Sequence, residues 1–547
     1  MKLRNLILSL IIIGGMSCKS NRDFTNAYES INTDDLALYV SKLGSDEFMG
    51  RAPFTEGEDI TIKYLGEQLK KIGFDPAFGD SYFQEVPMVS VQTKITEPIV
   101  IQTPDKTFSL TWPDQLAISS ARVVDEIAIS ESALVFAGFG ITAPEYDWDD
   151  YNNIDVSGKT VVVLVNDPGL YTGDEKLFKG REMTYYGRWT YKYEEAAKRG
   201  ASGILIIHET EGAGYTYGIP RNSSLTPNLY MATGNGNNDM CMFNGWIEAE
   251  AAGKLFSDLG YNIEELRMEA CKSGFTGFDM ESAISLELTN KSEFNSSYNV
   301  AGVLEGKDHP DEVIIYSGHW DHFGIGEVQD GDSIYNGAVD NGTTMAMMFE
   351  VGEAFASLEE RPSRSVMLFF PTAEEQGLLG SNYYVENPAF PIEKTVANIN
   401  NDLVLPVGRM RDVMVTGYGQ SDLDDYLAVA AMAQDRYIFP DPNAHTGMYF
   451  RSDHFSFAKK GVPALYARGN CDSREHGKEW AAAQEKDYID TKYHKAADNY
   501  YPELWDMSGI KEDAQISFDI GYQLANSDKW PGWKESSEFK SLRSELK

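Results

Sequence analysis

Short runs of apolar residues alternate with longer amphipathic stretches along much of this chain, which is the pattern of an α/β fold. The apolar runs at 312–317, 365–371 and 395–401 predict three buried strands. Between the first two runs, residues 343–358 show helical apolar periodicity. Strands that alternate with helices pair in parallel, so we predict an α/β fold with a mixed, largely parallel sheet flanked by helices.

Amphipathic patterns predict further helices on both sides of this region. Residues 34–43 and 57–72 carry apolar positions at helical spacing, and we expect both helices to cover one face of the sheet. Residues 513–525 predict a last helix. The stretch 83–121 is rich in strand-forming residues, but its pattern does not define individual strands.

The rhythm of the sequence changes between residues 123 and 287, where turns rich in Gly, Pro, Asn and Asp become frequent. Three short apolar runs predict strands at 133–142, 160–165 and 203–208. Residues 189–199 predict a helix that Gly200 terminates. We therefore predict a separate β-rich domain that is inserted into the α/β fold.

Polar residues of metal-binding type follow the three predicted strands and recur later in the chain. They are His319, Asp340, Glu375, Asp402 and His494. The carboxyl ends of parallel strands meet at one edge of a sheet, where such folds place their chemistry. Zinc binds imidazole nitrogen and carboxylate oxygen, and a carboxylate can bridge two ions. Glu374, beside Glu375, could then act as a general base.

Each of these motifs is common by itself, but their order along one chain is specific. The order is strand-His-x-Asp, Gly-Ala-x-Asp-Asn, strand-x-Glu-Glu-x-Gly-Leu-Leu-Gly-Ser, strand-Asn-x-Asp and a late Tyr-His. From about residue 34 to 527 the chain resembles the cocatalytic di-zinc aminopeptidases, a family that also includes glutamate carboxypeptidase II. The resemblance implies a role for each site residue.

By this resemblance, His319 and Asp402 bind one zinc, Glu375 and His494 bind the other, and Asp340 bridges both ions. Glu374 is the implied general base. Asp321 is the implied carboxylate that holds the second ring nitrogen of His319 and so fixes its tautomer. Asp453 and His454 also lie in a stretch typical of the family, and we expect a structural or substrate-side role for them because the ligand set is already complete.

The inserted segment resembles a protease-associated domain, chiefly at Gly138-Phe139-Gly140-Ile141 and across 155–167 and 194–203. Two roles remain open for it: a stabilising module, or a lid that limits substrate size. The predicted division of the chain has five parts: a signal peptide at 1–18, the start of the catalytic domain with connecting strands at 23–122, the insert at 123–287, the zinc peptidase catalytic domain at 288–530 and a polar tail at 531–547.

The predicted function is that of an exported zinc-dependent exopeptidase that removes amino-terminal residues from peptides. A hydroxide held between two zinc ions would attack the peptide carbonyl, with Glu374 as general base; cobalt or manganese could replace zinc. One alternative is a carboxypeptidase or dipeptidase, for which Arg181, Arg188 and Arg451 are candidates to bind a substrate carboxylate. Two others are a glutaminyl cyclase, which uses one zinc, and a receptor-like relative without activity.

The amino terminus predicts export. Lys2 and Arg4 precede an apolar run at 6–13 that is too short to span a bilayer, and Cys18 follows a small residue. This pattern resembles a bacterial lipoprotein signal, although an ordinary cleaved signal with an incidental cysteine would look similar. We expect a periplasmic or outer-membrane lipoprotein, or a secreted protein, with membrane contact only through a lipid anchor at Cys18.

Composition agrees with this layout and limits the classes of binding partner that we expect. The 547 residues are 42% hydrophobic, enough for a large core and a second domain, and carry a formal net charge of −37. Such a charge argues against nucleic acid as a partner and leaves peptides as the expected one. Cys241 and Cys271 could form a disulfide and leave Cys471 free. The oligomeric state stays open.

Overall fold

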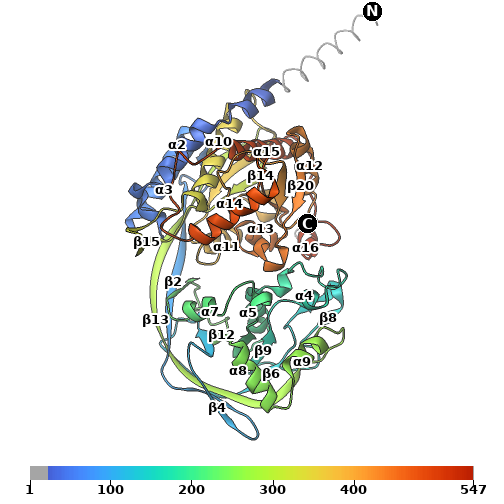
Figure 1. The fold of residues 1–547 in the computed structure, drawn as a ribbon. Coiled ribbons are helices and arrows are strands. Elements are labelled where there is room, and N and C mark those ends of the chain that lie inside the picture. The colour runs from blue at the N-terminus through green and yellow to red at the C-terminus, as the bar shows by residue number, and fades with distance from the viewer. Residues whose placement is uncertain (1–21, 546–547) are drawn as a thin grey trace, which may run out of the picture. The chain divides into compact units, whose positions relative to one another are not determined.

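A computed structural model describes residues 22–545 of the chain, which divides into two compact units (Figure 1). Unit 1 consists of the described residues within Met1–Val86, Ser297–Asp441 and Ser452–Lys547. Unit 2 consists of Pro87–Ser296 and Pro442–Arg451. The predicted signal peptide at 1–18 and its Cys18 lie outside the described residues.

A mixed sheet with parallel central strands forms the centre of unit 1. β14 (His309–Ser317) pairs in parallel with β17 (Arg364–Phe370) on one side and with β18 (Thr395–Asn400) on the other. β18 pairs in parallel with β21 (Ala464–Arg468). All three strands predicted after residue 300 are thus present and adjacent, which confirms the predicted fold class.

The parallel centre of this sheet is flanked on both sides by strands that run against its direction. β13 (Phe278–Leu304) pairs antiparallel with β17, and β1 (Asp75–Pro76) pairs with β13. β19 (Asp412–Val415) is antiparallel to β21 and parallel to β20 (Tyr437–Pro440). The sequence pattern did not predict β13, whose 27 residues contribute to both units.

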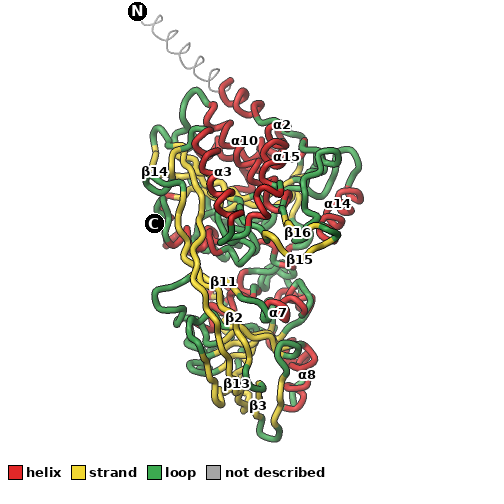
Figure 2. The backbone as a smooth tube through the Cα atoms, turned by 90° about the vertical axis from the view of Figure 1, so that its left-hand side faces the viewer, coloured by secondary structure: helices red, strands yellow, loops and turns green. Residues whose placement is uncertain are grey.

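Alternate residues of the central strands pack on opposite faces of the sheet. Ile314 and Tyr316 of β14 belong to one core cluster, whereas Val313 and Ile315 belong to another. The first face is covered by α2 (Thr33–Leu43), α3 (Glu56–Lys71), α10 (Thr344–Ser357) and α15 (Ser508–Ala525), which lie together in Figure 2. The second is covered by α11 (Leu379–Glu386) and α13 (His454–Ala458). Each buried aliphatic or aromatic side chain stabilises this three-layer arrangement by about 1.5–3 kcal/mol.

Further helices of unit 1 follow the central strands. α12 (Leu423–Ala433) packs beside α15, α14 (Lys478–Thr491) precedes the loop that carries His494, and α16 (Lys540–Glu545) lies within the predicted polar tail. α2 and α3 begin within one residue of the predicted starts, whereas α15 begins five residues before the predicted residue 513. The side chain of Asn32 explains the start of α2, because it accepts the N–H groups of Asp34 and Asp35.

Unit 2 contains a second sheet in which β6 (Glu126–Phe136), β9 (Thr160–Leu164), β10 (Gly203–Ile207) and β12 (Phe243–Ile247) are parallel neighbours. Val161 and Val163 of β9 face one core cluster, and Val162 and Leu164 face another. The predicted helix at 189–199 is α5 (Trp189–Lys198), and Gly200 beyond it has φ +75°. The remaining helices are α4 (Pro168–Thr172), α6 (Thr210–Ala213), α7 (Gly218–Ser223), α8 (Ala249–Asp258) and α9 (Ile263–Ala270).

Unit 2 is wider than the predicted insert at 123–287. The reason is strand pairing: β5 (Leu116–Ser119) pairs with β12, and β3 (Ile99–Gln102) pairs with both β4 (Thr107–Leu110) and β13. β11 (Asn228–Met231) pairs with β2 (Phe83–Ile95), so most of β2 also belongs to unit 2. These strands account for the strand-rich stretch at 83–121 that the sequence pattern did not resolve.

The cysteines of unit 2 do not form the disulfide that was considered for them. Cys241 and Cys271 are both buried free thiols, and they belong to different core clusters, one on each face of the sheet. Cys471 of unit 1 is also free. Among residues 22–545, the search for a membrane-spanning helix of sufficient length and apolarity finds no candidate.

Candidate metal centre

Three parallel strands of unit 1 deliver candidate ligands to one edge of the sheet. β14 ends two residues before His319, and β18 ends two residues before Asp402. β17 ends at Phe370, and the loop beyond it carries Glu374 and Glu375. Because neighbouring parallel strands end at the same edge, residues far apart in the sequence meet there. Asp340 arrives from the irregular segment Ala338–Thr343 directly before α10, close to its predicted place at a helix start.

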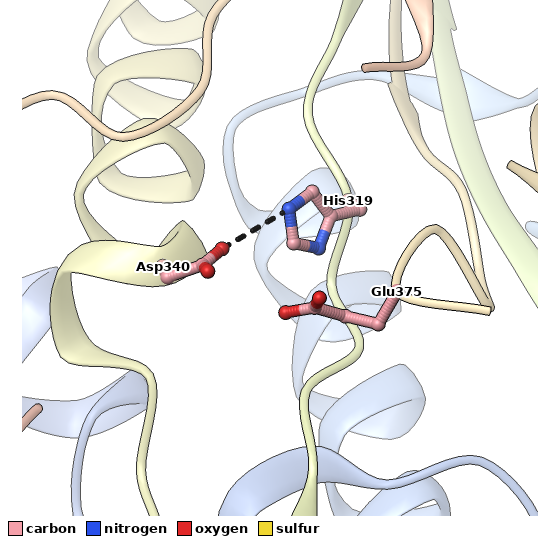
Figure 3. A group of neighbouring side chains, drawn as sticks. All are labelled: His319, Asp340 and Glu375. Carbon is pink, nitrogen blue, oxygen red and sulfur yellow. Dashed lines mark ion pairs between the residues drawn. The ribbon is translucent and has the colours of Figure 1, made fainter. Parts of the chain in front are cut away.

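Asp340 lies between two histidines. Its Oδ1 is 3.3 Å from Nε2 of His319, and its Oδ2 is 3.3 Å from Nε2 of His494. Asp402 Oδ1 lies 3.5 Å from the first histidine, and Glu375 Oε2 lies 3.1 Å from the second. Figure 3 shows the side chains of His319, Asp340 and Glu375 pointing toward one another. The structure thus brings the five predicted ligands into two overlapping groups that share Asp340.

These separations fit the geometry of zinc ligation. Two donors bound at about 2.0–2.1 Å to one tetrahedral zinc lie about 3.3–3.4 Å apart. The observed separations in the two groups are 3.1 to 3.5 Å. Asp402 Oδ1 is also buried without a hydrogen-bond partner among the described residues, as expected for an oxygen that needs a cation. The donor chemistry and the separations in both groups therefore fit metal binding.

The site carries an excess of negative charge. Four carboxylates face three imidazoles, those of His319, His322 and His494. The carboxylates are those of Asp340, Glu374, Glu375 and Asp402. Burial opposes the charged form of His494, but Glu375 and Asp340 outweigh that effect and raise its pKa to about 10. Burial together with Asp402 and Glu375 holds the pKa of Glu374 well above its usual range, although His319 opposes the shift. Bound cations would relieve this repulsion.

Asp321 fixes the loop that carries the two glutamates. Its carboxylate accepts the backbone N–H of Glu374 at 3.0 Å and that of Glu375 at 3.4 Å. Nδ1 of His319 lies 3.1 Å from the backbone oxygen of Asp321 but 3.8 Å from its carboxylate. The ring therefore bonds to the Asp321 carbonyl and not, as the resemblance implied, to the carboxylate. Since a carbonyl only accepts, the proton sits on Nδ1 and Nε2 is left to bind metal.

Glu374 lies next to the ligand groups without being needed to complete either. Its side chain is buried, with Oε2 at 3.8 Å from His319 Nε2. Asp453 and His454 are fully buried in the same unit, and neither carboxylate oxygen of Asp453 has a hydrogen-bond partner among the described residues. Asp453 also helps to raise the pKa of Glu374, so it lies close enough to act on it electrostatically.

His322 contacts the candidate ligand Glu375, and the sequence analysis did not predict this contact. Its Nδ1 lies 2.8 Å from Glu375 Oε1, the oxygen that does not face His494. This contact orients the Glu375 carboxylate and keeps one of its oxygens turned toward the ligand group. The motif His319-Trp320-Asp321-His322 showed the residue, but nothing local in the sequence indicated which of its two histidines would take which role.

Arg51 is a second missed residue and holds two ligand loops together. Its guanidinium is fully buried and donates to the backbone oxygens of Trp320 at 2.8 Å and Gly337 at 2.9 Å. It also donates to the backbone oxygen of Asn336. One side chain thereby connects the loop after His319 with the loop before Asp340. No pattern around residue 51 predicted this role.

The loop before Asp340 also requires a glycine. Gly337 has φ +53°, and a Cβ atom there would lie 2.1 Å from the backbone oxygen of Asp340 and 2.6 Å from the ring of His322. Any other residue would therefore displace the central carboxylate. The fixed backbone and the buried donors together make a preorganised centre.

Comparison with known proteins assigns the domain that carries this centre. Residues 299–517 match the sequence profile of Peptidase family M28. In this part the chain is similar to that family, and we call residues 299–517 the M28 domain. The M28 domain contains all five candidate ligands and Glu374, which agrees with the predicted enzyme class, a metallopeptidase.

Individual relatives match the chain only in part. Carboxypeptidase Q of Xenopus laevis is 33% identical over 371 residues, which are 68% of this chain and 63% of that protein. A probable leucine aminopeptidase 2 of Aspergillus oryzae is 27% identical over 225 residues, 40% of this chain and 43% of that protein. The chain thus spans less than two thirds of either relative. A solved aminopeptidase from Aneurinibacillus sp. strain AM-1 is 15% identical with a TM-score of 0.49, over 93% of this chain and 97% of that one.

Proposed function

We propose that this protein is an exported, zinc-dependent aminopeptidase that holds two zinc ions in its M28 domain. The observation that carries the proposal is the position of Asp340, which presents one oxygen to His319 and the other to His494. Asp402 completes the first group and Glu375 the second. The mixed imidazole and carboxylate donors suit zinc, and cobalt or manganese could occupy the same positions.

The protein's own residues supply proton transfer and orientation. When bound, zinc would polarise a peptide carbonyl and make a water molecule more acidic. Glu374 lies beside the ligand groups, where its carboxylate could take a proton from the attacking water and deliver it to the nitrogen of the leaving amine. The Asp321 carboxylate accepts the backbone N–H of Glu374 and holds that backbone in place, so the Glu374 carboxylate keeps its distance from the ligands.

A carboxypeptidase or dipeptidase is the second candidate, and one observation in unit 2 favours it. Of the three arginines considered for a substrate carboxylate, Arg181 already pairs with Glu211. Arg188, by contrast, forms no ion pair with a described residue, and a second arginine, Arg451, acts on it electrostatically. Burial and Arg451 lower the pKa of Arg188 to about 10. In a chain of net charge −37, such a pair would suit an anionic group of a substrate.

Three further features belong to the same proposal. Unit 2 would include a protease-associated domain, which its parallel strands β6, β9, β10 and β12 and helix α5 support. The basic and apolar residues before Cys18 support export with a lipid anchor. The complete donor set argues against a glutaminyl cyclase with one zinc and against a receptor without activity.

Hydrolysis of matched dipeptides tests the proposal. Purified protein is assayed on free, amino-blocked and carboxyl-blocked dipeptides, with chelator and with zinc added back. Cleavage that needs a free amino terminus, is lost with chelator and returns with zinc is the expected result. A requirement for a free carboxylate would replace the aminopeptidase by the carboxypeptidase. No cleavage by zinc-loaded protein would overturn both.

A further inference from the structure

A second group of carboxylates lies in unit 1 where α2 packs against α10. The two helices meet through Tyr39 and Phe349, whose rings stack with centroids 4.9 Å apart. Asp35 stands in the first turn of α2, and Glu350 and Glu353 stand on α10. One oxygen from each of these three carboxylates lies within 4.8 Å of the other two.

Glu350 is the buried member of this group, and only one of its two carboxylate oxygens accepts a hydrogen bond from a described residue. Its side chain is 2% exposed, and Oε2 accepts the backbone N–H of Asn32 at 2.7 Å. Oε1 is buried and has no hydrogen-bond partner among residues 22–545. A buried carboxylate oxygen without a partner is costly, so such an oxygen indicates a missing ligand or a proton.

No basic side chain neutralises the group. None of the three carboxylates forms an ion pair with a described lysine, arginine or histidine. Burial, and then the charges of Glu353 and Asp35, raise the pKa of Glu350 to about 7, while Asn32 opposes the shift. Lys511 also opposes it, as the smallest of these effects. The local charge is therefore negative, and no ion pair with a residue of 22–545 compensates it.

Hydrogen bonds hold the two outer carboxylates in place and leave an oxygen on each for a ligand. Nδ2 of Asn32 donates to Asp35 Oδ2 at 2.7 Å. The hydroxyl of Tyr39 donates to Glu353 Oε1 at 2.5 Å. Three oriented carboxylates with spare oxygens thus surround the unpartnered atom of Glu350.

We propose that Asp35, Glu350 and Glu353 bind one calcium ion that fastens α2 to α10. The donors are all carboxylate oxygens, which hard cations prefer. Calcium bonds to oxygen at about 2.3–2.6 Å and accepts six to eight ligands in loose geometry, so donors across the ion lie up to about 5 Å apart. Oxygens that lie within 4.8 Å of one another can share one such ion, with water completing the shell. Magnesium demands near-ideal octahedral geometry and gives up its water reluctantly, so a site of three carboxylates on two helices suits calcium better.

A calcium ion at this position would stabilise a helix that adjoins the metal centre. α10 begins at Thr344, directly after the segment Ala338–Thr343 that carries Asp340. Glu350 therefore lies less than two helical turns beyond the start of that helix. A calcium ion there would fix the helix that follows the central carboxylate, without touching any residue of the metal centre.

Calcium binding to the zinc-loaded full-length protein tests this proposal. Equilibrium dialysis with calcium should find one ion per chain, and calcium at millimolar concentration should raise the thermal unfolding midpoint by about 2–4 °C. Magnesium at equal ionic strength should raise it less. In the double variant Asp35→Asn, Glu353→Gln, both the bound ion and the shift should disappear. Asp34→Asn is the matched control, because Asp34 is in the same turn but outside the group, and should keep both.

The single variant Glu350→Gln keeps the test conclusive if the double variant fails to fold. It removes the buried charge and should fold as well as the parent without calcium, yet lose the calcium-dependent shift. The proposal is overturned if the parent binds no calcium beyond the zinc centre. It is also overturned if the ion persists in the double variant or in Glu350→Gln, because the ligand residues would then lie elsewhere.

Discussion

The carboxylate of Asp498 accepts the backbone N–H of Asp340, with 3.0 Å between Oδ2 and the nitrogen. It also accepts the N–H of Val339 and the hydroxyl of Tyr488. Asp498 is not one of the candidate metal ligands, but it fixes the backbone that carries the Asp340 carboxylate. Outer contacts of this kind decide how well a ligand keeps its position.

Replacing Asp498 by asparagine should therefore weaken metal binding while every ligand remains. We expect zinc affinity, measured by competition with a chelating indicator, to fall about 10–100-fold. Asp490→Asn on α14 is the control, because Asp490 is exposed and its carboxylate accepts from Lys486, whereas Lys495 donates to its backbone oxygen. This variant should bind zinc as the parent does. An unchanged affinity in Asp498→Asn would show that the Asp340 backbone needs no such support.

Replacing Glu374 by glutamine should separate proton transfer from metal binding. The amide keeps the size of the side chain but cannot accept the water's proton, so turnover should fall by at least about 10²-fold. Metal content, measured by atomic absorption, should stay at the parental value. Asp340→Ala should instead lose metal, since both histidine groups share that carboxylate. Substantial activity in Glu374→Gln would remove Glu374 from the mechanism.

Lys192 should be essential for the stability of unit 2. Its ammonium group is fully buried and donates to the backbone oxygens of Phe139, Asn166 and Tyr186 at 2.6 to 3.1 Å. Burial lowers the pKa of Lys192 to about 7, although Asp167 and Asp150 oppose the shift. Lys192→Met would leave three buried carbonyls without their donor. We expect unit 2 to lose about 3–5 kcal/mol in denaturant unfolding.

Lys198→Met provides the comparison for Lys192. Both residues lie on α5, but the side chain of Lys198 is 78% exposed and makes only a surface pair with Glu195. The control should change stability by less than about 0.5 kcal/mol. Equal losses of stability in the two variants would show that the buried Lys192 amine contributes no more to stability than an exposed lysine does.

Glu58 should make stability depend on pH in a defined direction. Burial raises its pKa from 4.5 to about 7, although the backbone N–H of Phe54 and the hydroxyl of Ser297 oppose the shift. Between these values the folded state binds more protons than the unfolded state, so the unfolding free energy falls as pH rises and the loss is complete above pH 7. Glu58→Gln removes this titration.

The stability difference between Glu58→Gln and the parent should thus grow in favour of the variant from pH 4.5 to 8, by up to about 3 kcal/mol. Chemical denaturation at several pH values measures it. Glu56→Gln, at an exposed position on the same helix, is the matched control. A constant difference for Glu58→Gln would contradict the assignment.

Local patterns predicted the central strands and helices well. β14, β17 and β18 coincide with the apolar runs at 312–317, 365–371 and 395–401 because burial on both faces demands continuous apolar residues. β13 was missed because its 27 residues mix exposed and buried positions over two units and have no single period. The width of unit 2 was missed for a related reason: strand pairing between distant segments leaves no local signal.

The order of residues by itself determined which side chains could bind metal and which strands would carry them, because ligand chemistry and strand periodicity are local properties. Only the tertiary structure decided how those side chains are held. Arg51 reaches the carbonyl of Trp320 across 269 residues, and Asp498 reaches Asp340 across 158. The carboxylates on α2 and α10 likewise meet only after folding. Such contacts depend on how helices and loops pack in space, and the spacing of residues along a chain does not encode that packing in any short pattern.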